Sequence, residues 1–541
     1  MKLRKKNVVL FVLVAGLAAG SVTLHHASAS EEIAETETEK LETERKQIKS
    51  IYTSSYQNKV EARLETAKST GNYTEEAMLI EQNPYGTNTL SLYVYFETEE
   101  NAKVSYTVSA ADKDIEDFSA VPEDEEEYQT EHEFQVIGLV PDQKNTVIFT
   151  ITTESGEERS YTYECKMGSL VGEEESQLEV TEDNTQGEEI GNGLYVILGN
   201  DSDGLDFMYY YDKNGVIRGE IPLIGYRSHR LLFQNGLMYY SISQTKIAAV
   251  NTLGKVEKIY DTGKYELHHD YVFDDDGNLL VLATDTEKDS VEDQIIRIDT
   301  STGEVTCVLD LADLFGDYKA QCATEEGEEL DWMHINTIQW LGEGTVLLSS
   351  RETSSIFKIS GLYDTPQVDY IIGEGSFWEG SGYEELLLTK DESSGTFSGL
   401  GGQHSITYEE STDLEENEYY IYMFNNNFGV SESNPDYNWS QIEGIETSIK
   451  GGDTSYFYQY KVNEKTGEYT LAKSFEVPFS SYVSSAQKYD GNIVIDSGFQ
   501  GLFGEYDSEG NLLRQYKMDL ATKYIYRVYK YDFEGFYFAQ E

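Results

Sequence analysis

The alternation of apolar and polar positions predicts β-strands over most of the chain. Residues 89–96, 103–108 and 146–151 alternate in this way, as strands do when one of their faces is buried. Turns separate these short runs. Residues 75–171 are therefore predicted to form a small antiparallel β-sandwich.

From about residue 191 onward, strands recur with turns that begin with Asn or Asp and end with Gly. These turns end at Gly215, Gly254, Gly303, Gly467 and Gly510. Turns of this kind close β-hairpins. A repeat of about 40–50 residues built from strands alone is typical of β-propeller blades. With allowance for loop insertions, residues 191–541 are predicted to form a propeller of about six blades, so the predicted fold class is all-β.

Two acidic segments flank the predicted sandwich. Residues 30–74 are rich in Glu, Lys, Arg and Gln and have few apolar positions, which indicates either a solvated helical leader or a disordered one. Residues 172–190 contain Glu173–Glu175 and a second acidic pair, and are interpreted as a linker to the propeller.

The amino terminus has the pattern of a secretory signal. A basic start (Lys2–Lys6) precedes an apolar run that ends near Leu24, and Ala27–Ala29 offers a small-residue cleavage site. Residues 1–29 are therefore interpreted as a signal peptide, and the rest is expected to be exported, to the cell surface or beyond. The apolar run has about 17 residues, against the ~20 that span a bilayer. An uncleaved anchor remains the alternative, and it is the only membrane contact expected.

Composition narrows the function classes. The 541 residues include 99 acidic and 40 basic ones, for a net charge of −59, and such a surface disfavours nucleic-acid binding. The 42 tyrosines favour strands. The three cysteines are too few for a disulfide scaffold and show no metal-ligand spacing. Cys307 and Cys322 are close enough in sequence to pair, although three buried thiols are an equally good interpretation.

Of eight histidines, five lie in the propeller segment. In a regular strand, His334 and Asn336 share one face with Trp332, because residues of equal parity do. Arg351 ends an apolar strand, where a lone cation needs an anion. Two glycines shortly before His404 allow a close backbone approach.

Each of these residues alone is more typical of a hydrogen-bonded structural position. The innermost strands of a propeller, however, converge on one channel. Together they predict a site for an anion with several oxygen atoms, built from neutral imidazoles and one guanidinium. No metal ion is expected there.

The chain contains four short motifs in a fixed order: His268-His269-Asp270, Asp331-Trp332-x-His334-x-Asn336, Ser349-Ser350-Arg351 and Gln403-His404. Together they resemble the aryl-sulfate sulfotransferase family. The sandwich is similar to that family's amino-terminal domain at 83–88 and 138–141, so the resemblance covers about residues 75–541. It implies a six-bladed propeller that transfers a sulfuryl group from a phenolic sulfate ester to an acceptor phenol. It also implies a covalent sulfohistidine, no nucleotide donor and no cofactor.

The resemblance also implies roles for single residues. His404 matches the nucleophile, and His334, Asn336 and Arg351 match the residues that bind sulfate and stabilise charge. His269 matches the histidine before the aspartate, whereas its neighbour His268 would face the opposite way in a regular strand. Either His334 or His269 would carry the proton of the phenol.

The aromatic ring of a substrate needs flat walls at the channel mouth. Four aromatic residues are candidates, although residues of this kind are more often part of the core: Trp332, Trp378, Tyr422 and Phe424. The chain departs from the family pattern at Asn425–Gly429, which puts the acceptor side of the site in question.

Two other functions remain open from the sequence. One is a non-catalytic surface propeller that binds a ligand or a protein partner. The other is an aryl sulfatase, which would use water as the acceptor. The sequence does not fix the oligomeric state, and a homodimer is among the open states.

Overall fold

The computed structural model describes residues 38–185, 190–199, 204–324, 326–393, 395–520 and 523–540. The predicted signal peptide lies outside the described residues. The chain divides into two compact units, Met1–Gln47 and Ile48–Glu541. In the first unit, residues 38–47 are helical. Among the described residues, no helix has the length and apolar character needed to cross a bilayer.

The amino-terminal domain is a six-stranded antiparallel sheet folded into a sandwich. Its strands are β1 (Leu79–Gln82), β2 (Leu92–Ala110), β3 (Phe118–Ala120), β4 (Gln129–Val136), β5 (Lys144–Thr153) and β6 (Glu158–Lys166). Two of the strands predicted from alternation are the two halves of β2. The register changes between Glu97 and Ala102, so the first half pairs mainly with β4 and the second with β5.

Part of the predicted leader is an ordered helix, α2 (Ser54–Thr70). The Thr53 side chain accepts a hydrogen bond from the Tyr56 amide and caps its amino end. Val60 and Leu64 are buried against tyrosines of the sandwich. One face of this helix is therefore packed, which corrects the expectation of a fully solvated or disordered leader for this segment.

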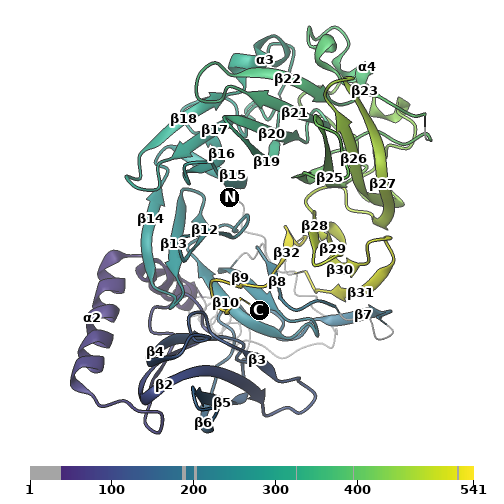
Figure 1. The fold of residues 1–541 in the computed structure, drawn as a ribbon. Helices are drawn as coiled ribbons and strands as arrows, with labels where there is room; N and C mark the ends of the chain where they lie inside the picture. Colours follow the sequence, from purple (N-terminus) through teal and green to yellow (C-terminus); the bar gives the residue numbers. More distant parts are fainter. Residues whose placement is uncertain are drawn as a thin grey trace, which may run out of the picture. The chain divides into compact units, whose positions relative to one another are not determined.

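Six antiparallel sheets follow one another around a common centre and confirm the six-bladed propeller (Figure 1). The first three blades are β11 (Leu232–Gln234), β12 (Leu237–Ser243), β13 (Lys246–Asn251) and β14 (Val256–Asp261); β15 (Tyr265–Phe273), β16 (Leu279–Asp285), β17 (Gln294–Ile298) and β18 (Val305–Asp310); and β19 (Ile335–Gly342), β20 (Thr345–Ser350), β21 (Ser355–Ser360) and β22 (Gln367–Ile372).

The other three blades complete the ring. They are β24 (His404–Glu409), β25 (Glu418–Asn425), β26 (Thr454–Asn463) and β27 (Glu468–Pro478), with β23 (Thr389–Lys390) at the edge; β28 (Ser485–Tyr489), β29 (Asn492–Ser497), β30 (Leu502–Tyr506) and β31 (Leu512–Lys517); and β32 (Val528–Tyr531), β8 (Leu194–Ile197), β9 (Asp206–Tyr211) and β10 (Ile217–Leu223). Short helices lie in the connections: α3 (Ala312–Lys319), α4 (Gly375–Trp378), η1 (Glu384–Leu386), η2 (Trp439–Gln441) and η3 (Gly498–Gln500).

The ring closes through strands that are far apart in the sequence. β32, near the carboxyl terminus, pairs with β8 and becomes the innermost strand of the last blade. Within the predicted acidic linker, Glu179–Asp183 forms β7, which pairs with β31 as a fifth strand. The linker segment therefore contributes to the propeller itself.

The three cysteines are free thiols, so the Cys307–Cys322 pairing left open by the sequence is not formed. Cys307 is exposed, and its thiol lies 3.5 Å from the Gln294 side-chain oxygen. Cys322 is half-buried and lies 3.5 Å from the Tyr318 carbonyl oxygen.

A buried ion pair at the ring closure provides a test of the fold. Lys530 on β32 and Glu505 on β30 are 2.8 Å apart and fully buried, and the Tyr195 hydroxyl of β8 also donates to Glu505. We expect Lys530→Met to lower the free energy of unfolding by about 3–5 kcal/mol, because it leaves a buried carboxylate without its cation.

Denaturant unfolding would measure this loss. The matched control is Lys144→Met, which removes an exposed ion pair with Glu164 and should cost at most ~1 kcal/mol. Equal effects of the two substitutions would contradict the role of Lys530 in closing the ring.

Candidate active site

The predicted site histidines lie within β15, just before β19 and at the start of β24, and these innermost strands are distorted there. The pairing register shifts between Leu267 and Tyr271 in β15, between Ile335 and Thr337 in β19, and immediately after His404 in β24. His269, His334 and Ser405 have positive φ values of 54°, 47° and 57°. Bulges of this kind turn side chains away from the regular alternation.

The distortion overturns two orientations expected from strand parity. His268 and His269 do not point apart, because their Nδ1 atoms lie 3.2 Å from each other. Trp332 does not share a face with His334. It is fully buried in the hydrophobic core, and its indole N–H donates to Asp293 at 2.7 Å.

The other three candidates for the channel wall are also core residues. Trp378 and Phe424 have no exposed surface, and Tyr422 is 6% exposed. Trp378 packs in the same cluster as Trp332, whereas Tyr422 and Phe424 pack in another. None of the four aromatic side chains is placed to receive a substrate ring.

His404 is held with its Nδ1 protonated. Nδ1 lies 2.8 Å from the Gly402 carbonyl oxygen and 2.8 Å from the Asn426 side-chain oxygen. Asn426 donates its amide N–H groups to the carbonyls of Ser480 and Val483, which assigns its oxygen to His404. Because both partners accept, Nδ1 carries the proton and Nε2 keeps a lone pair.

Burial lowers the pKa of His404 to about 3, and the positive charges of Arg527, His334 and Arg351 act in the same direction. His404 is 3% exposed. At neutral pH it is therefore an uncharged imidazole with a free nitrogen lone pair, which is the form of a nucleophile or a base.

His334 has the opposite protonation state. Its Nδ1 lies 2.5 Å from an Asp331 oxygen and 2.9 Å from a Glu292 oxygen. Burial and Arg351 lower the pKa of His334, but Asp331 and Glu292 outweigh them and raise it to about 9. Burial alone would raise the pKa of Glu292, yet His334 and His268 lower it to about 2. His334 is therefore an imidazolium beside the ionised carboxylate of Glu292.

His269 and His268 complete the histidine cluster. The ring of His269 lies 4.8 Å from that of His334 and 5.3 Å from that of His268. Burial lowers the pKa of both, and the positive charge of His334 lowers that of His269 further. Both are neutral at pH 7, so the cluster holds one charged and several uncharged imidazoles.

Arg351 lies beside these histidines and lines a cavity of about 200 Å³. Its guanidinium donates to buried Glu352 at 2.9 Å, so the anion it needs is supplied within the protein. The other residues lining this cavity are Phe428, Val430, Glu432, Ile449, Ser481 and Tyr482.

The glycines before His404 have the predicted role. Gly402 has a φ of 61°, and a Cβ added there would lie 2.9 Å from the Phe428 carbonyl oxygen and 3.7 Å from Cγ of Arg351. A Cβ at Gly401 would lie 2.7 Å from the Phe428 amide nitrogen. Only glycine allows the His404 and Phe428 segments to approach this closely.

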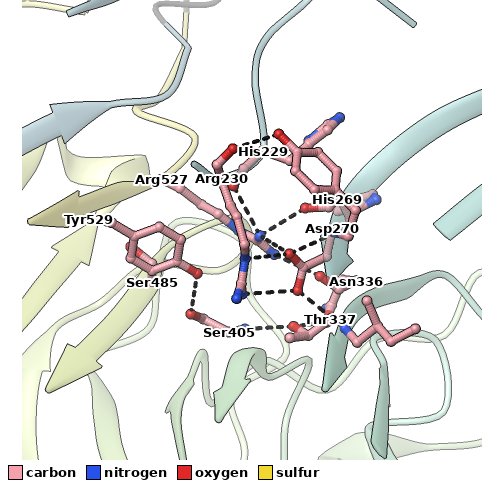
Figure 2. Close-up of polar contacts among 12 residues, drawn as sticks. His229, Arg230, His269, Asp270, Asn336, Thr337, Ser405, Ser485, Arg527 and Tyr529 are labelled. Atoms are coloured by element: carbon pink, nitrogen blue, oxygen red, sulfur yellow. Dashed lines mark hydrogen bonds and ion pairs between the residues drawn. The ribbon is translucent and has the colours of Figure 1, made fainter. Parts of the chain in front are cut away.

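A buried polar network lies against the site and joins the innermost strands (Figure 2). Arg527 donates to the carbonyls of His269 at 2.8 Å and Asn336 at 2.7 Å. Asp270 pairs with Arg230 at 2.8 Å and with Arg527 at 3.6 Å. These contacts fix the backbone that carries the histidines.

Asn336 belongs to this supporting layer. It is fully buried, and one of its amide N–H groups donates at 2.8 Å to the carbonyl of Gln403, the residue before His404. It therefore ties the His334 strand to the His404 strand across two blades.

Sequence reasoning missed four residues of the site: Glu292, Asn426, Glu352 and Arg527. Glu292 lies in the loop between β16 and β17 and carries no local signal, because one glutamate in an acidic chain does not stand out. Asn426 lies in the segment that departs from the family pattern, and this departure was the one available hint. Asp331 was part of a motif but had no role assigned.

Among the residues that the structure describes, two overlapping groups have ligand atoms close enough to hold a metal ion. They are His268, His269 and Glu292, and Glu292, Asp331 and His334, with the ligand atoms of each group within 4.8 Å of one another. A metal on Nδ1 of His334 would replace the proton that this atom shares with the carboxylates. Metal binding there and a protonated His334 therefore exclude each other.

Two family models match this chain. Residues 179–527 match the arylsulfotransferase (ASST) model, beginning at the first residue of β7, and residues 79–168 match the arylsulfotransferase Ig-like domain. The chain belongs to the arylsulfotransferase family. It is thus an aryl sulfotransferase, whose family uses a phenolic sulfate as donor and a phenol as acceptor.

Three solved structures resemble this arylsulfotransferase at low sequence identity. A protein of unknown function from Bacteroides caccae is 13% identical, with a TM-score of 0.37 over 62% of this chain and 98% of its own. A putative 6-phosphogluconolactonase from Bacteroides fragilis is 10% identical, with a TM-score of 0.35 over 80% and 99%. Virginiamycin B lyase from Staphylococcus aureus is 11% identical, with a TM-score of 0.32 over 64% and 91%. No curated protein matches the chain.

The electrostatics of the cluster can be tested directly. Glu292→Gln removes a negative charge that raises the pKa of His334, so we expect that pKa to fall from about 9 by roughly 1–3 units. NMR titration of protein with ¹³C-labelled histidine would measure it, with the His334 signal identified by its loss in His334→Gln. The control Glu287→Gln neutralises a carboxylate in the same loop, and an equal shift in both variants would contradict the assignment.

Proposed function

We propose that this arylsulfotransferase works by a ping-pong mechanism through a sulfohistidine on Nε2 of His404. The observation that carries the proposal is the opposite protonation of two neighbouring histidines in one channel, with His404 neutral and His334 charged. Titratable groups whose pKa values are pushed apart in this way divide the roles of base and acid.

In the first half-reaction, the lone pair of His404 Nε2 attacks the sulfur of a phenolic sulfate ester. An N–S bond forms and the bond from sulfur to the phenolic oxygen breaks. His334 gives its proton to the departing phenolate, whose free pKa would be near 10. This leaves a sulfohistidine and a neutral His334.

In the second half-reaction, an acceptor phenol loses its proton to His334 and attacks the same sulfur. The N–S bond breaks, and His404 and His334 return to their starting states. Because both esters are phenolic, the two half-reactions are nearly balanced in free energy and need no energy-rich nucleotide.

The remaining residues support this chemistry. We assign Arg351 to the sulfuryl oxygen atoms, where its fixed charge stabilises the transition state. Neutral His269 contributes to binding, and His334 is preferred over His269 as proton carrier because its pKa is the raised one. Asn336 acts as a positioning residue, since its amide is bonded to the backbone beside His404.

The cavity beside Arg351 is the proposed site of the aromatic ring. Phe428 and Tyr482 line it and replace the four core aromatics as candidates for the flat walls. We also propose that the enzyme acts outside the cytoplasm, as the amino-terminal signal pattern indicates. A sulfate ester donor suits such a compartment, because no nucleotide is required.

Trapping the intermediate tests the mechanism. After brief exposure to 4-nitrophenyl sulfate without acceptor, we expect intact-mass analysis to find one added sulfuryl group, mapped to His404, that disappears when phenol is added. His404→Ala should form no adduct and transfer no sulfate. Free sulfate released at the same rate with and without phenol would instead indicate an aryl sulfatase.

The pH dependence provides a second test. His334 must be protonated in the first half-reaction, so kcat/KM for a phenyl sulfate donor should fall as the pH rises through about 9. In His334→Gln this alkaline fall should disappear and the rate should be low throughout. A donor with a good leaving group, such as 4-nitrophenyl sulfate, should be less affected. An unchanged alkaline limb in His334→Gln would contradict the assignment of the acid.

A further inference from the structure

A fourth arginine of the channel region, Arg227, is held by aromatic rings instead of carboxylates. Its guanidinium carbon lies 3.9 Å from the ring centre of Tyr526 and 4.8 Å from that of Tyr226. It also donates to the Tyr524 hydroxyl at 3.3 Å. Stacked rings orient the guanidinium without neutralising its charge.

Arg227 differs from its neighbours in having no counter-ion. Arg230 and Arg527 share Asp270, and Arg351 has Glu352. Within the described ranges, by contrast, no carboxylate pairs with Arg227, and its Nε, like those of Arg230 and Arg527, is buried without a hydrogen-bond partner. A partly buried cation without an anion is costly, which suits a site that receives its anion from a ligand.

The surroundings of Arg227 lead back to the histidine cluster. One tyrosine ring, that of Tyr526, separates it from His269 and lies 6.2 Å from the His269 ring. The His269 ring is in turn 4.8 Å from that of His334. The charge of Arg227 lowers the pKa of both His229 and His269. Arg227 is therefore within electrostatic reach of the site, at about the width of one aromatic ring beyond His269.

His229 adds a second unsatisfied group on the same side. It is fully buried, and neither ring nitrogen has a hydrogen-bond partner. Its ring lies 5.7 Å from Tyr226 and 5.7 Å from Tyr526, the two rings that hold Arg227. Burial keeps this imidazole neutral, so it adds no repulsive charge of its own to an anion.

The sulfuryl group itself is not the anion that Arg227 lacks. The charges that act most on the nucleophile His404 are those of Arg527, His334 and Arg351. Arg227 acts instead on His229 and His269, on the far side of the cluster. Its ligand must therefore be a second anionic group, carried by the same substrate at the other end of an aromatic ring.

Building on the proposed function, we propose that Arg227 binds a carboxylate on the ring of the phenolic substrate. The preferred substrates are then hydroxyaryl carboxylic acids and their sulfate esters. A carboxylate matches the planar fork of a guanidinium and forms two charge-assisted hydrogen bonds with it. The ring between the two ends lies in the cavity beside Arg351 and packs against Tyr482, whose own ring is 5.6 Å from that of Tyr524, the hydroxyl partner of Arg227.

Two acceptors of equal shape but different charge test this specificity. We expect the full-length enzyme to use 4-hydroxybenzoate better than 4-hydroxybenzamide at pH 7. In Arg227→Gln the ratio of their kcat/KM values should fall by about 10- to 100-fold, the usual range for a lost charged hydrogen bond. Arg227→Lys, which keeps the charge, should retain part of the preference.

The matched control is Arg297→Gln, which removes an arginine paired with Asp274 on another part of the propeller. It should leave the ratio unchanged. If Arg227→Gln weakens both acceptors equally while Arg227→Lys restores neither, Arg227 has only a structural role and the proposal is overturned.

Binding without turnover separates this inference from the proposed mechanism. Isothermal titration of 4-hydroxybenzoate into the wild-type chain and into Arg227→Gln needs no sulfuryl transfer. Affinity that depends on Arg227 supports the site even if no sulfohistidine forms. Equal affinity of the wild type for 4-hydroxybenzoate and 4-hydroxybenzamide overturns the proposal even if the transferase mechanism holds.

Discussion

The proton on His334 depends on Glu292 and Asp331, and the proposed chemistry of the channel depends on that proton. Burial by itself would lower the pKa of every histidine in the cluster and leave each of them uncharged at neutral pH. Two carboxylates within 2.9 Å of Nδ1 reverse this for His334 alone, while His404 faces only the neutral acceptors Gly402 and Asn426. One buried channel therefore holds one charged and one uncharged imidazole, the states that the proposed acid and the proposed nucleophile each need.

Backbone distortion is what brings these side chains together. Residues with positive φ recur near the beginning of innermost strands, at His334, Ser405 and Ser484, and within β15 at His269. For residues other than glycine this conformation is strained, and it persists only when the surroundings hold it. Arg527 does so by donating to backbone carbonyls at two of these strands. The buried polar network thus stabilises the strained backbone conformation on which the site depends.

The charge of the channel contrasts with that of the chain as a whole. The net charge is −59, yet Arg227, Arg230, Arg351 and Arg527 lie close to the histidine cluster. Three of them pair with two buried carboxylates: Arg230 and Arg527 share Asp270, and Arg351 pairs with Glu352. These pairs hold the guanidinium groups in place but leave a net positive charge. An acidic surface around a cationic site also disfavours large polyanions, while a small aryl sulfate meets only the local field.

The sequence by itself determined the all-β class, the sandwich, the blade repeat and the family, because alternation, turn residues and short motifs are local properties of the chain. It also singled out His334, Arg351, His404 and His269 as candidate site residues, and their roles stay predictions. Only the tertiary structure decided that β7 and β32 complete blades from distant segments, that α2 packs on the sandwich, and that Trp332 is a core residue. Parity failed at His268 because a bulge breaks the regular alternation within β15, and at Trp332 because β19 begins only at Ile335. Glu292, Asn426 and Arg527 could not be predicted from the sequence, because their roles arise from contacts between segments that are far apart in the chain.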